Sequence, residues 1–421
     1  MVPNGWECKT FATLIKSGDV TQIQDGNHGN SHPKSSDFVS SGIPFIMARD
    51  LINGSINFTN CSYIARKQAD SLRIGFSIPG DILLSHKGTV GQVAIVPEVD
   101  DYIMLTPQVT YYRLPQSSKL HNLYLYQYFL SSGFQERLKY LSAQSTRSYI
   151  GITAQKELPI TLPPLPEQRK IAKILSTWDK AISTTEALIE TSKQQKKALM
   201  QQLLTGKKRL VDPETGEKFD GEWERYSMSD LVFIDRKSLG KKTADDFEFQ
   251  YISLSDVDVG SISKKLEVHK FASAPSRARR VIQEGDILLS TVRPNLKGFA
   301  KVSGKHADCI ASTGFSILTP KKRVSGDYIY QYIFSSHITG QIDSLVVGSN
   351  YPAINSSDVS GLKVYCPTHE EQQKIAQVLT AADKEIEIFE SKLAHLKQEK
   401  KALMQQLLTG KRRVIVWGEL E

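Results

Sequence analysis

The sequence predicts an α+β protein with two similar domains of mixed α and β structure and two long helices that pack on each other as a coiled coil. Three observations predict this class: a length of 421 residues, a long segment that occurs twice, and short strand-like runs outside the two copies. A chain of this length exceeds what one hydrophobic core usually organises, so two or more domains are expected.

The repeated segment is the strongest signal in the chain. EQRKIAKILSTWDKAISTTEALIETSKQQKKALMQQLLTGKKRL begins at Glu167, and EQQKIAQVLTAADKEIEIFESKLAHLKQEKKALMQQLLTGKRRV begins at Glu371. The offset between the copies, 371 − 167, is 204 residues. GDILLS also occurs twice, at Gly80 and at Gly285. The order is therefore domain, helix, domain, helix.

Each copy is predicted to form one long helix. Pro166 and Pro367 precede the two copies, and Gly206 and Gly410 stand where a C-terminal cap is expected. Apolar residues spaced alternately by four and three form one stripe along each helix, which is typical of a two-helix coiled coil. The predicted seam consists of Ile171, Leu175, Trp178, Ile182, Ile189, Leu199, Leu203, Ile375, Leu379, Ile386, Phe389, Leu393, Leu396, Leu403 and Leu407.

Two alternatives for this stripe stay open. A single stripe is best explained by burial against the helix's own domain, whereas two matching stripes favour packing of the helices on each other. Lys196 and Lys400 occupy corresponding seam positions. They either set the register of the pair or lie where the seam has opened.

The predicted domain boundaries follow from the repeat. Short β-branched or aromatic runs such as DILLS, VTYYRL and LKVYCP predict strands, and apolar residues every three or four positions predict shorter helices at 123–141 and 326–342. We assign residues 1–165 to the first domain, 166–206 to the first long helix, 207–369 to the second domain, 370–410 to the second long helix and 411–421 to a C-terminal tail.

Composition narrows the class of protein. No apolar run approaches the roughly 20 residues of a membrane helix, and the first residues, MVPNGWECKTF, lack the pattern of a signal peptide, so we expect a cytoplasmic protein without a membrane partner. The cysteines, Cys8, Cys61, Cys309 and Cys366, are far apart and suggest neither a zinc site nor a disulfide framework. The formal net charge of +8 favours an anionic partner such as nucleic acid.

The repeated motifs resemble those of a known family. EQ.KIA..L...D..I, the polar helix and the final KKALMQQLLTGK, together with GDILLS and the loops STRSYIGIT and GSNYPAINSSDV, resemble the specificity subunits of type I restriction-modification systems over essentially the whole chain. The resemblance implies two target recognition domains, each reading one half of an asymmetric, bipartite site in double-stranded DNA. It implies antiparallel helices that span a spacer of unspecified bases.

The resemblance also implies partners. Two adenine-methylating modification subunits would dock on the helices, and translocating restriction subunits would join them. S-adenosylmethionine, ATP and magnesium would be used by these partners, and this chain would need no cofactor of its own.

Helix length agrees with half-site reading. A straight helix over residues 167–204 would span roughly 57 Å at about 1.5 Å per residue, which is comparable to one or two turns of B-DNA at roughly 34 Å each. Two such helices related by a pseudo-twofold axis would place two similar domains at opposite ends.

The catalytic motifs expected of an enzyme are missing from the sequence. There is no Asn-Pro-Pro-aromatic motif of adenine methyltransferases, and no GxxxxGK[ST] phosphate loop. A Glu-x-Lys tripeptide at 399–401 lies on the polar helix, where chance explains it. His28 and His32 have the i, i+4 spacing of metal ligands, but Gly29 and Pro33 argue against the helix that would align them. We therefore expect a chain without catalysis and without a metal.

Polar loops are the candidate DNA contacts, because their side chains bond base edges and phosphates. The candidates of the first domain are Gln24, Asn27, His28, Asn30, His32, Lys34, His86, Lys87, Thr89, Thr146, Arg147, Ser148 and Tyr149, and those of the second are Arg293, Asn295, Lys297, Ser349, Asn350 and Tyr351. The basic residues 207–209 and 411–413 either complement the helix dipole or contact phosphates. The alternative function is a scaffold, in which the coiled coil organises other proteins and the domains bind peptides.

Overall fold

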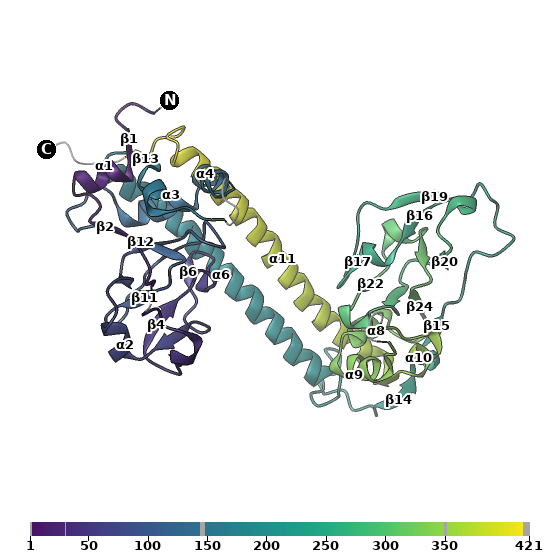
Figure 1. Ribbon diagram of the computed structural model, residues 1–421. Helices are drawn as coiled ribbons and strands as arrows, with labels where there is room; N and C mark the ends of the chain where they lie inside the picture. Colours follow the sequence, from purple (N-terminus) through teal and green to yellow (C-terminus); the bar gives the residue numbers. More distant parts are fainter. Residues whose placement is uncertain (1, 30, 144–147, 349–351, 416–421) are drawn as a thin grey trace. The chain divides into compact units, whose positions relative to one another are not determined.

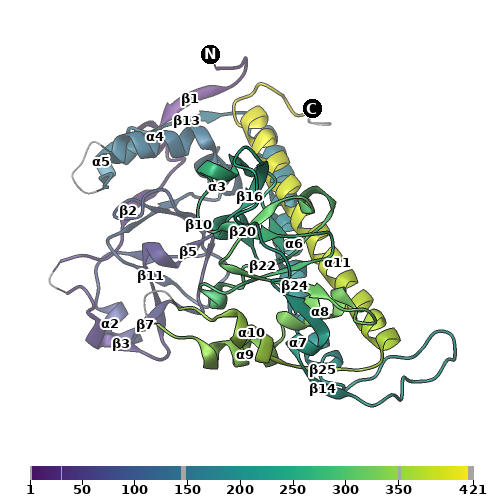
Figure 2. The same ribbon diagram turned by 90° about the vertical axis from the view of Figure 1, so that its right-hand side faces the viewer.

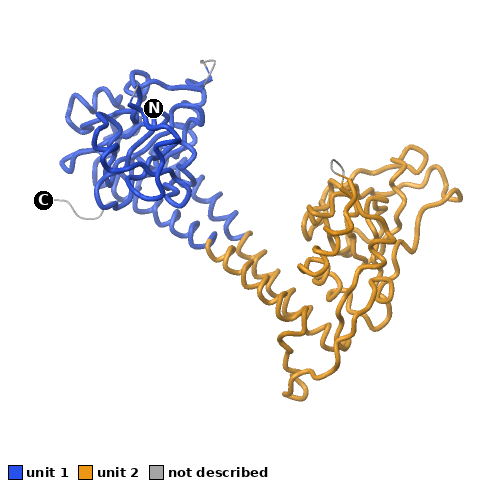
Figure 3. Tube along the Cα trace, turned by 60° about the horizontal axis from the view of Figure 1, so that its bottom comes forward, with its two compact units in different colours: residues 1–186, 391–421 blue, residues 187–390 orange. Residues whose placement is uncertain are grey.

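The computed structural model describes residues 2–29, 31–143, 148–348 and 352–415 (Figure 1). The chain divides into two compact units (Figure 3). Unit 1 comprises residues 1–186 and 391–421, and unit 2 comprises residues 187–390. Each unit contains one domain of short strands and helices together with segments of both long helices.

The domain of unit 1 is built on two sheets, with strand orders β10-β9-β12-β2 and β3-β7-β4-β11-β8. Its strands are β1 (Glu7–Thr10), β2 (Gln22–Asp25), β3 (Phe38–Val39), β4 (Ile43–Ile46), β5 (Leu51–Ile52), β6 (Ser55–Ile56), β7 (Ser62–Ile64), β8 (Phe76–Ser77), β9 (Ile82–Ser85), β10 (Val93–Ile95), β11 (Ile103–Leu105), β12 (Val109–Arg113) and β13 (Pro159–Leu162). Its short helices are α1 (Phe11–Lys16), α2 (Arg66–Asp70), α3 (Asn122–Leu130), α4 (Ser132–Ser142) and α5 (Ile152–Lys156).

The domain of unit 2 repeats this topology. Its sheets have the orders β15-β24-β21-β22 and β19-β16-β23-β20. Its strands are β14 (Glu224–Ser227), β15 (Val232–Ile234), β16 (Glu248–Ile252), β17 (Val257–Asp258), β18 (Ser261–Ile262), β19 (Glu267–Lys270), β20 (Ala278–Val281), β21 (Ile287–Ser290), β22 (Phe299–Lys301), β23 (Ile310–Ser312), β24 (Phe315–Pro320) and β25 (Lys363–Cys366). Its short helices are α7 (Met228–Leu231), α8 (Gly326–Ile333), α9 (Ser336–Leu345) and α10 (Ser356–Gly361). The second sheet holds one parallel pair in each domain, β4 with β11 and β16 with β23.

The repeated run DILLS forms the equivalent strands β9 and β21, and both are buried on two faces. Ile82 and Leu84 belong to the core beneath the helices, whereas Leu83 belongs to the core between the two sheets. In unit 2, Ile287 and Leu289 belong to the core beneath the helices, and Leu288 belongs to the core between the two sheets. Because successive side chains of a strand point to opposite faces, a strand buried on both faces needs a continuous apolar run.

The long helices are α6 (Leu165–Leu203) and α11 (His369–Leu407), and within each unit their segments pair in antiparallel orientation (Figures 1 and 2). In unit 1, Asp179 pairs with Lys400 at 2.5 Å and Glu186 with Lys397 at 2.7 Å. Residue numbers rise along one helix as they fall along the other. In unit 2, Lys193 pairs with Glu390 at 2.7 Å and Lys196 with Asp383 at 2.5 Å, again in antiparallel order. The predicted fold class is confirmed.

The apolar stripe has two environments. Toward the helix ends it enters the domain cores: Ile171, Leu175 and Leu407 in unit 1, and Leu203, Ile375 and Leu379 in unit 2. In the middle of the helices, Ile189 and Ile386 are each buried to 8% exposure outside these cores. Burial against the helix's own domain therefore explains the ends of the stripe, and packing of the two helices on each other stays the prediction for its middle.

Gly206 and Gly410 end the long helices in the left-handed region, with φ of +69° and +68°. The helices stop three residues before these glycines. A side chain at Gly206 would press on the ring of Trp223, and one at Gly410 would collide with the ring of Pro3. The caps therefore need glycine for conformation and for close packing. In the described part of the chain, no helix has the length and apolarity to cross a membrane.

Candidate nucleic-acid interface

Two segments that the sequence marked separately lie side by side in the domain of unit 1. Lys87, just after β9, forms an antiparallel bridge with Tyr149, just before α5. The Gly88 amide donates to the Ser148 carbonyl at 3.0 Å, and the Ile150 amide donates to the His86 carbonyl at 2.9 Å. Lys87, Thr89, Ser148 and Tyr149 are exposed. One surface therefore presents candidates from both segments.

The domain of unit 2 brings the same two segments together. Val292, just after β21, bridges Ala353, just before α10. The Arg293 amide donates to the Pro352 carbonyl at 2.7 Å, and the Ile354 amide donates to the Thr291 carbonyl at 2.9 Å. Arg293 and Asn295 are exposed and Lys297 is half-buried. Asn30, Thr146, Arg147, Ser349, Asn350 and Tyr351 lie outside the described residues.

His86 is not an exposed loop residue as predicted but is buried where three segments meet. Its Nδ1 lies 3.1 Å from the Ile150 carbonyl oxygen, and its Nε2 lies 3.2 Å from Asp25 Oδ1 at the end of β2. Burial lowers the pKa of the imidazole, and the Asp25 carboxylate opposes this only in part. The neutral imidazole has a single N–H, which donates from Nδ1 to the Ile150 carbonyl, so His86 holds the loop before α5 against the end of β9. Its Nε2 faces Asp25 without a hydrogen bond.

We expect the stability of unit 1 to fall as the pH drops below about 6.5, the usual pKa of an unfolded histidine. The unfolded chain takes up a proton there that folded His86 resists, so the free energy of unfolding decreases by at most about 1.4 kcal/mol per pH unit for this group. Urea unfolding of the chain and of His86→Gln between pH 7.5 and pH 5.5 measures this. The stability of the variant should depend less on pH than that of the wild type. The remaining dependence is due to His121, because burial lowers the pKa of that imidazole too. An identical pH dependence in both would contradict the assignment.

The first polar segment, which we predicted as an irregular surface loop, is partly core. Gln24 lies on β2, and its Oε1 accepts a hydrogen bond from the Tyr111 hydroxyl at 2.7 Å. Asn27 is 3% exposed, and its backbone N–H donates to the Leu105 carbonyl at 2.7 Å. His32 Nδ1 contacts the Asn27 carbonyl at 2.9 Å. Only His28 and Lys34 of the described candidates in this segment are exposed.

The arginines at the helix ends have carboxylate partners that sequence reasoning missed. Arg209 donates to both oxygens of Glu371 at 2.8 and 2.7 Å, and Arg413 donates to both oxygens of Glu167 at 2.7 Å. These pairs anchor the chain after each helix to the start of the other helix. Lys207, Lys208, Lys411 and Arg412 are exposed and stay candidates for phosphate contact.

A polar cluster connects each domain to both helices. In unit 1, Gln127 of α3 donates to Asp179 Oδ2 at 2.5 Å, and Lys400 donates to Asp179 Oδ1 at 2.5 Å. Gln331, Asp383 and Lys196 repeat this cluster in unit 2. Lys196 and Lys400 therefore lie at closed contacts, which favours a role in register over an opened seam. The two glutamines of these clusters lie 204 residues apart in the chain, and so do the two aspartates and the two lysines. This recurrence was the signal in the sequence that could have identified the cluster.

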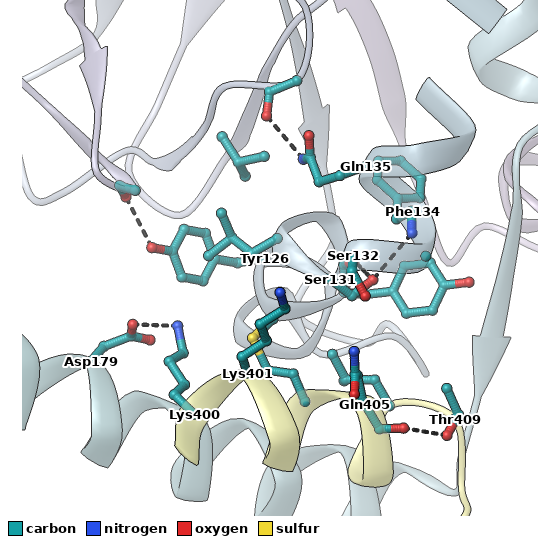
Figure 4. Close-up of a pocket in the computed structure, with 18 of the residues that line it drawn as sticks. Tyr126, Ser131, Ser132, Phe134, Gln135, Asp179, Lys400, Lys401, Gln405 and Thr409 are labelled. Atoms are coloured by element: carbon teal, nitrogen blue, oxygen red, sulfur yellow. Dashed lines mark hydrogen bonds and ion pairs between the residues drawn. The ribbon is translucent and has the colours of Figure 1, made fainter. Parts of the chain in front are cut away.

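Unit 1 also contains a cavity of about 1060 Å³ between α3, α4 and the long helices (Figure 4). Lys400 forms its ion pair with Asp179 at the helix side, and Gln135 donates to the Gly91 carbonyl at 2.9 Å on the opposite side. Among the described residues, the lining includes none of the candidate DNA contacts. The candidate interface lies elsewhere. In unit 1 it consists of the segment after β9 and the segment before α5, and in unit 2 of the segment after β21 and the segment before α10.

Comparisons with known proteins agree with this architecture. The sequence model described as "Type I restriction modification DNA specificity domain" matches residues 13–193 and 220–398. Two proteins of Methanocaldococcus jannaschii are similar over 98% of this chain: the putative type I restriction enzyme MjaX specificity subunit, 27% identical over 95% of its length, and the type I restriction enzyme MjaVIII specificity subunit, 26% identical over 94% of its length. The crystal structure of a type I restriction-modification S subunit from M. genitalium shares the fold, with a TM-score of 0.59, 15% identity and 97% coverage of each chain.

Proposed function

The chain belongs to the type I restriction-modification DNA specificity family, and on that premise we propose that it recognises a bipartite site in double-stranded DNA. One half-site is read by each domain. The chain is a specificity subunit and a non-catalytic component. We propose that it positions two modification subunits and the restriction subunits, and that these partners use S-adenosylmethionine, ATP and magnesium.

One observation supports this proposal most directly. In each domain, the segment after the repeated DILLS strand and the segment before the next short helix are joined by backbone hydrogen bonds at equivalent positions. Both surfaces carry exposed groups suited to base edges and phosphates, Lys87 and Thr89 in one and Arg293 and Asn295 in the other. Two similar surfaces in one chain suit the reading of two half-sites.

Arg293→Ala tests the proposal. Sequencing of methylated adenines in a host that carries this chain and its modification subunit should return two half-sites and a spacer. A bidentate arginine contact to a base contributes about 1–3 kcal/mol of discrimination, so the variant should relax one half-site only. Lys87→Ala, a change in the candidate interface of the other domain, should leave unchanged the half-site that Arg293→Ala relaxes. A motif without two halves would refute the proposal, and an unchanged motif in the arginine variant would remove Arg293 from the interface.

A further inference from the structure

Two exposed apolar side chains lie in the segments that form the candidate interface of unit 2. Leu296 is 63% exposed and Val347 is 77% exposed. The turn Pro294–Leu296 packs against α9, which ends two residues before Val347. Val347 bridges Ala353, and Ala353 also bridges Val292. These contacts bring Leu296 and Val347, which we call the apolar ledge, to the surface that carries Arg293 and Asn295.

The turn that presents Leu296 is held in one conformation. Arg293 and Lys297, on either side of it, have φ of +49° and +53°, the left-handed region that residues with a Cβ rarely adopt. Hydrogen bonds hold the turn there: the Leu296 amide donates to the Arg293 carbonyl at 3.0 Å, and the Lys297 amide donates to the Pro294 carbonyl at 2.9 Å. The ring of Pro294 is buried. Backbone hydrogen bonds within the turn therefore define the position of Leu296.

The residues around the ledge indicate what covers it. Arg293, Asn295 and Lys297 lie within the same turn, so the surface combines cationic and amide groups with apolar ones. Single exposed apolar residues need no explanation. The apolar ledge, however, lies among cationic and amide groups. Such a surface suits a polyanion that also offers an apolar group. In the major groove of DNA that group is the C5-methyl of thymine.

We propose that the apolar ledge contacts the C5-methyl group of a thymine in the half-site read by unit 2. This inference rests on the proposed function and adds one base identity to it. The corresponding turn of unit 1 runs from Lys87 to Val90, contains Gly88 at φ +78° and has no counterpart of Leu296. The position equivalent to Ala353 is Tyr149. Thymines of the other half-site serve as an internal control, because Leu296→Ala should leave the effect of their replacement unchanged.

The test removes the methyl group from the DNA. Once the motif is known, the full chain in complex with its modification subunit is bound to duplexes in which single thymines are replaced by deoxyuridine, on either strand. Burial of one methyl group contributes about 0.8 kcal/mol, which corresponds to about fourfold in affinity. One replacement in the unit 2 half-site should weaken binding by about that factor. Leu296→Ala should weaken binding to the thymine duplex and should reduce the further loss caused by deoxyuridine at that position.

Two control variants complete the design. Leu296→Met keeps an apolar group and should keep the sensitivity to deoxyuridine, and Val211→Ala removes an exposed apolar side chain outside the ledge and should change nothing. Intact recognition of the other half-site shows that each variant is folded. The inference is overturned if no replacement in the unit 2 half-site affects the wild type, or if Leu296→Ala retains the full sensitivity. Absence of any sequence-specific binding would instead refute the proposed function.

Discussion

Arg209→Ala is expected to destabilise unit 2 by about 3 kcal/mol, more than any other single change at the helix ends. Glu371 has no exposed side-chain surface, and both of its carboxylate oxygens accept hydrogen bonds from Arg209. Removal of one partner of a buried ion pair leaves the other charge buried and unpaired, which costs about 3–5 kcal/mol. The lower end applies because the guanidinium is partly exposed. Urea unfolding combined with hydrogen exchange of each unit measures the effect.

The internal repeat supplies the matched control. Arg413→Ala removes the equivalent arginine of unit 1, but Glu167 also accepts a hydrogen bond from Trp6 Nε1 at 3.0 Å. Trp223 Nε1 has no hydrogen-bond partner in the described part of the chain. Arg413 is also more exposed, so about 1 kcal/mol is expected for its loss. Glu371→Gln should recover part of the loss in Arg209→Ala. Equal losses in the two arginine variants, or no recovery, would contradict the argument.

The architecture could be predicted because it depends on periodicity. Alternating spacings of three and four predicted the long helices, and the apolar run DILLS predicted a strand in each domain. The offset of 204 residues predicted that whatever held for one domain would recur in the other. These patterns can be recognised in the sequence without knowledge of tertiary contacts.

The role of individual polar residues could not be predicted in the same way. His86 and Asn27 have the composition of surface loops, yet both are buried and make contacts with residues distant in sequence. Arg209 is 162 residues from Glu371, so nothing local marks it as part of an ion pair rather than a phosphate contact. A polar residue is buried when the fold brings it a partner, and only tertiary structure reveals that partner.

Lengthening both helices by seven residues is expected to widen the spacer of the DNA site by about three base pairs. Seven residues add roughly 10 Å of helix at about 1.5 Å per residue, and one base pair occupies about 3.4 Å of the duplex. The insertions belong between Ile189 and Glu190 and between Leu393 and Ala394. Seven residues are close to two helical turns, so the apolar stripe keeps its phase. Sequencing of methylated adenines for the wild type and the variant compares the spacers.

These insertion points keep every ion pair between the helices intact. On the unit 1 side of the insertions lie the pairs Asp179–Lys400 and Glu186–Lys397. On the unit 2 side lie the pairs Lys193–Glu390 and Lys196–Asp383. The polar clusters that anchor each domain to both helices move as rigid groups, so the bases of each half-site should not change. Seven residues in α6 alone should abolish recognition, because the pairs on the two sides can then no longer form together. Four residues in both helices should disturb it by rotating the stripe. An active seven-residue variant with the original spacer would show that the helices do not set the distance, and altered half-site bases would show that the domains do not read independently.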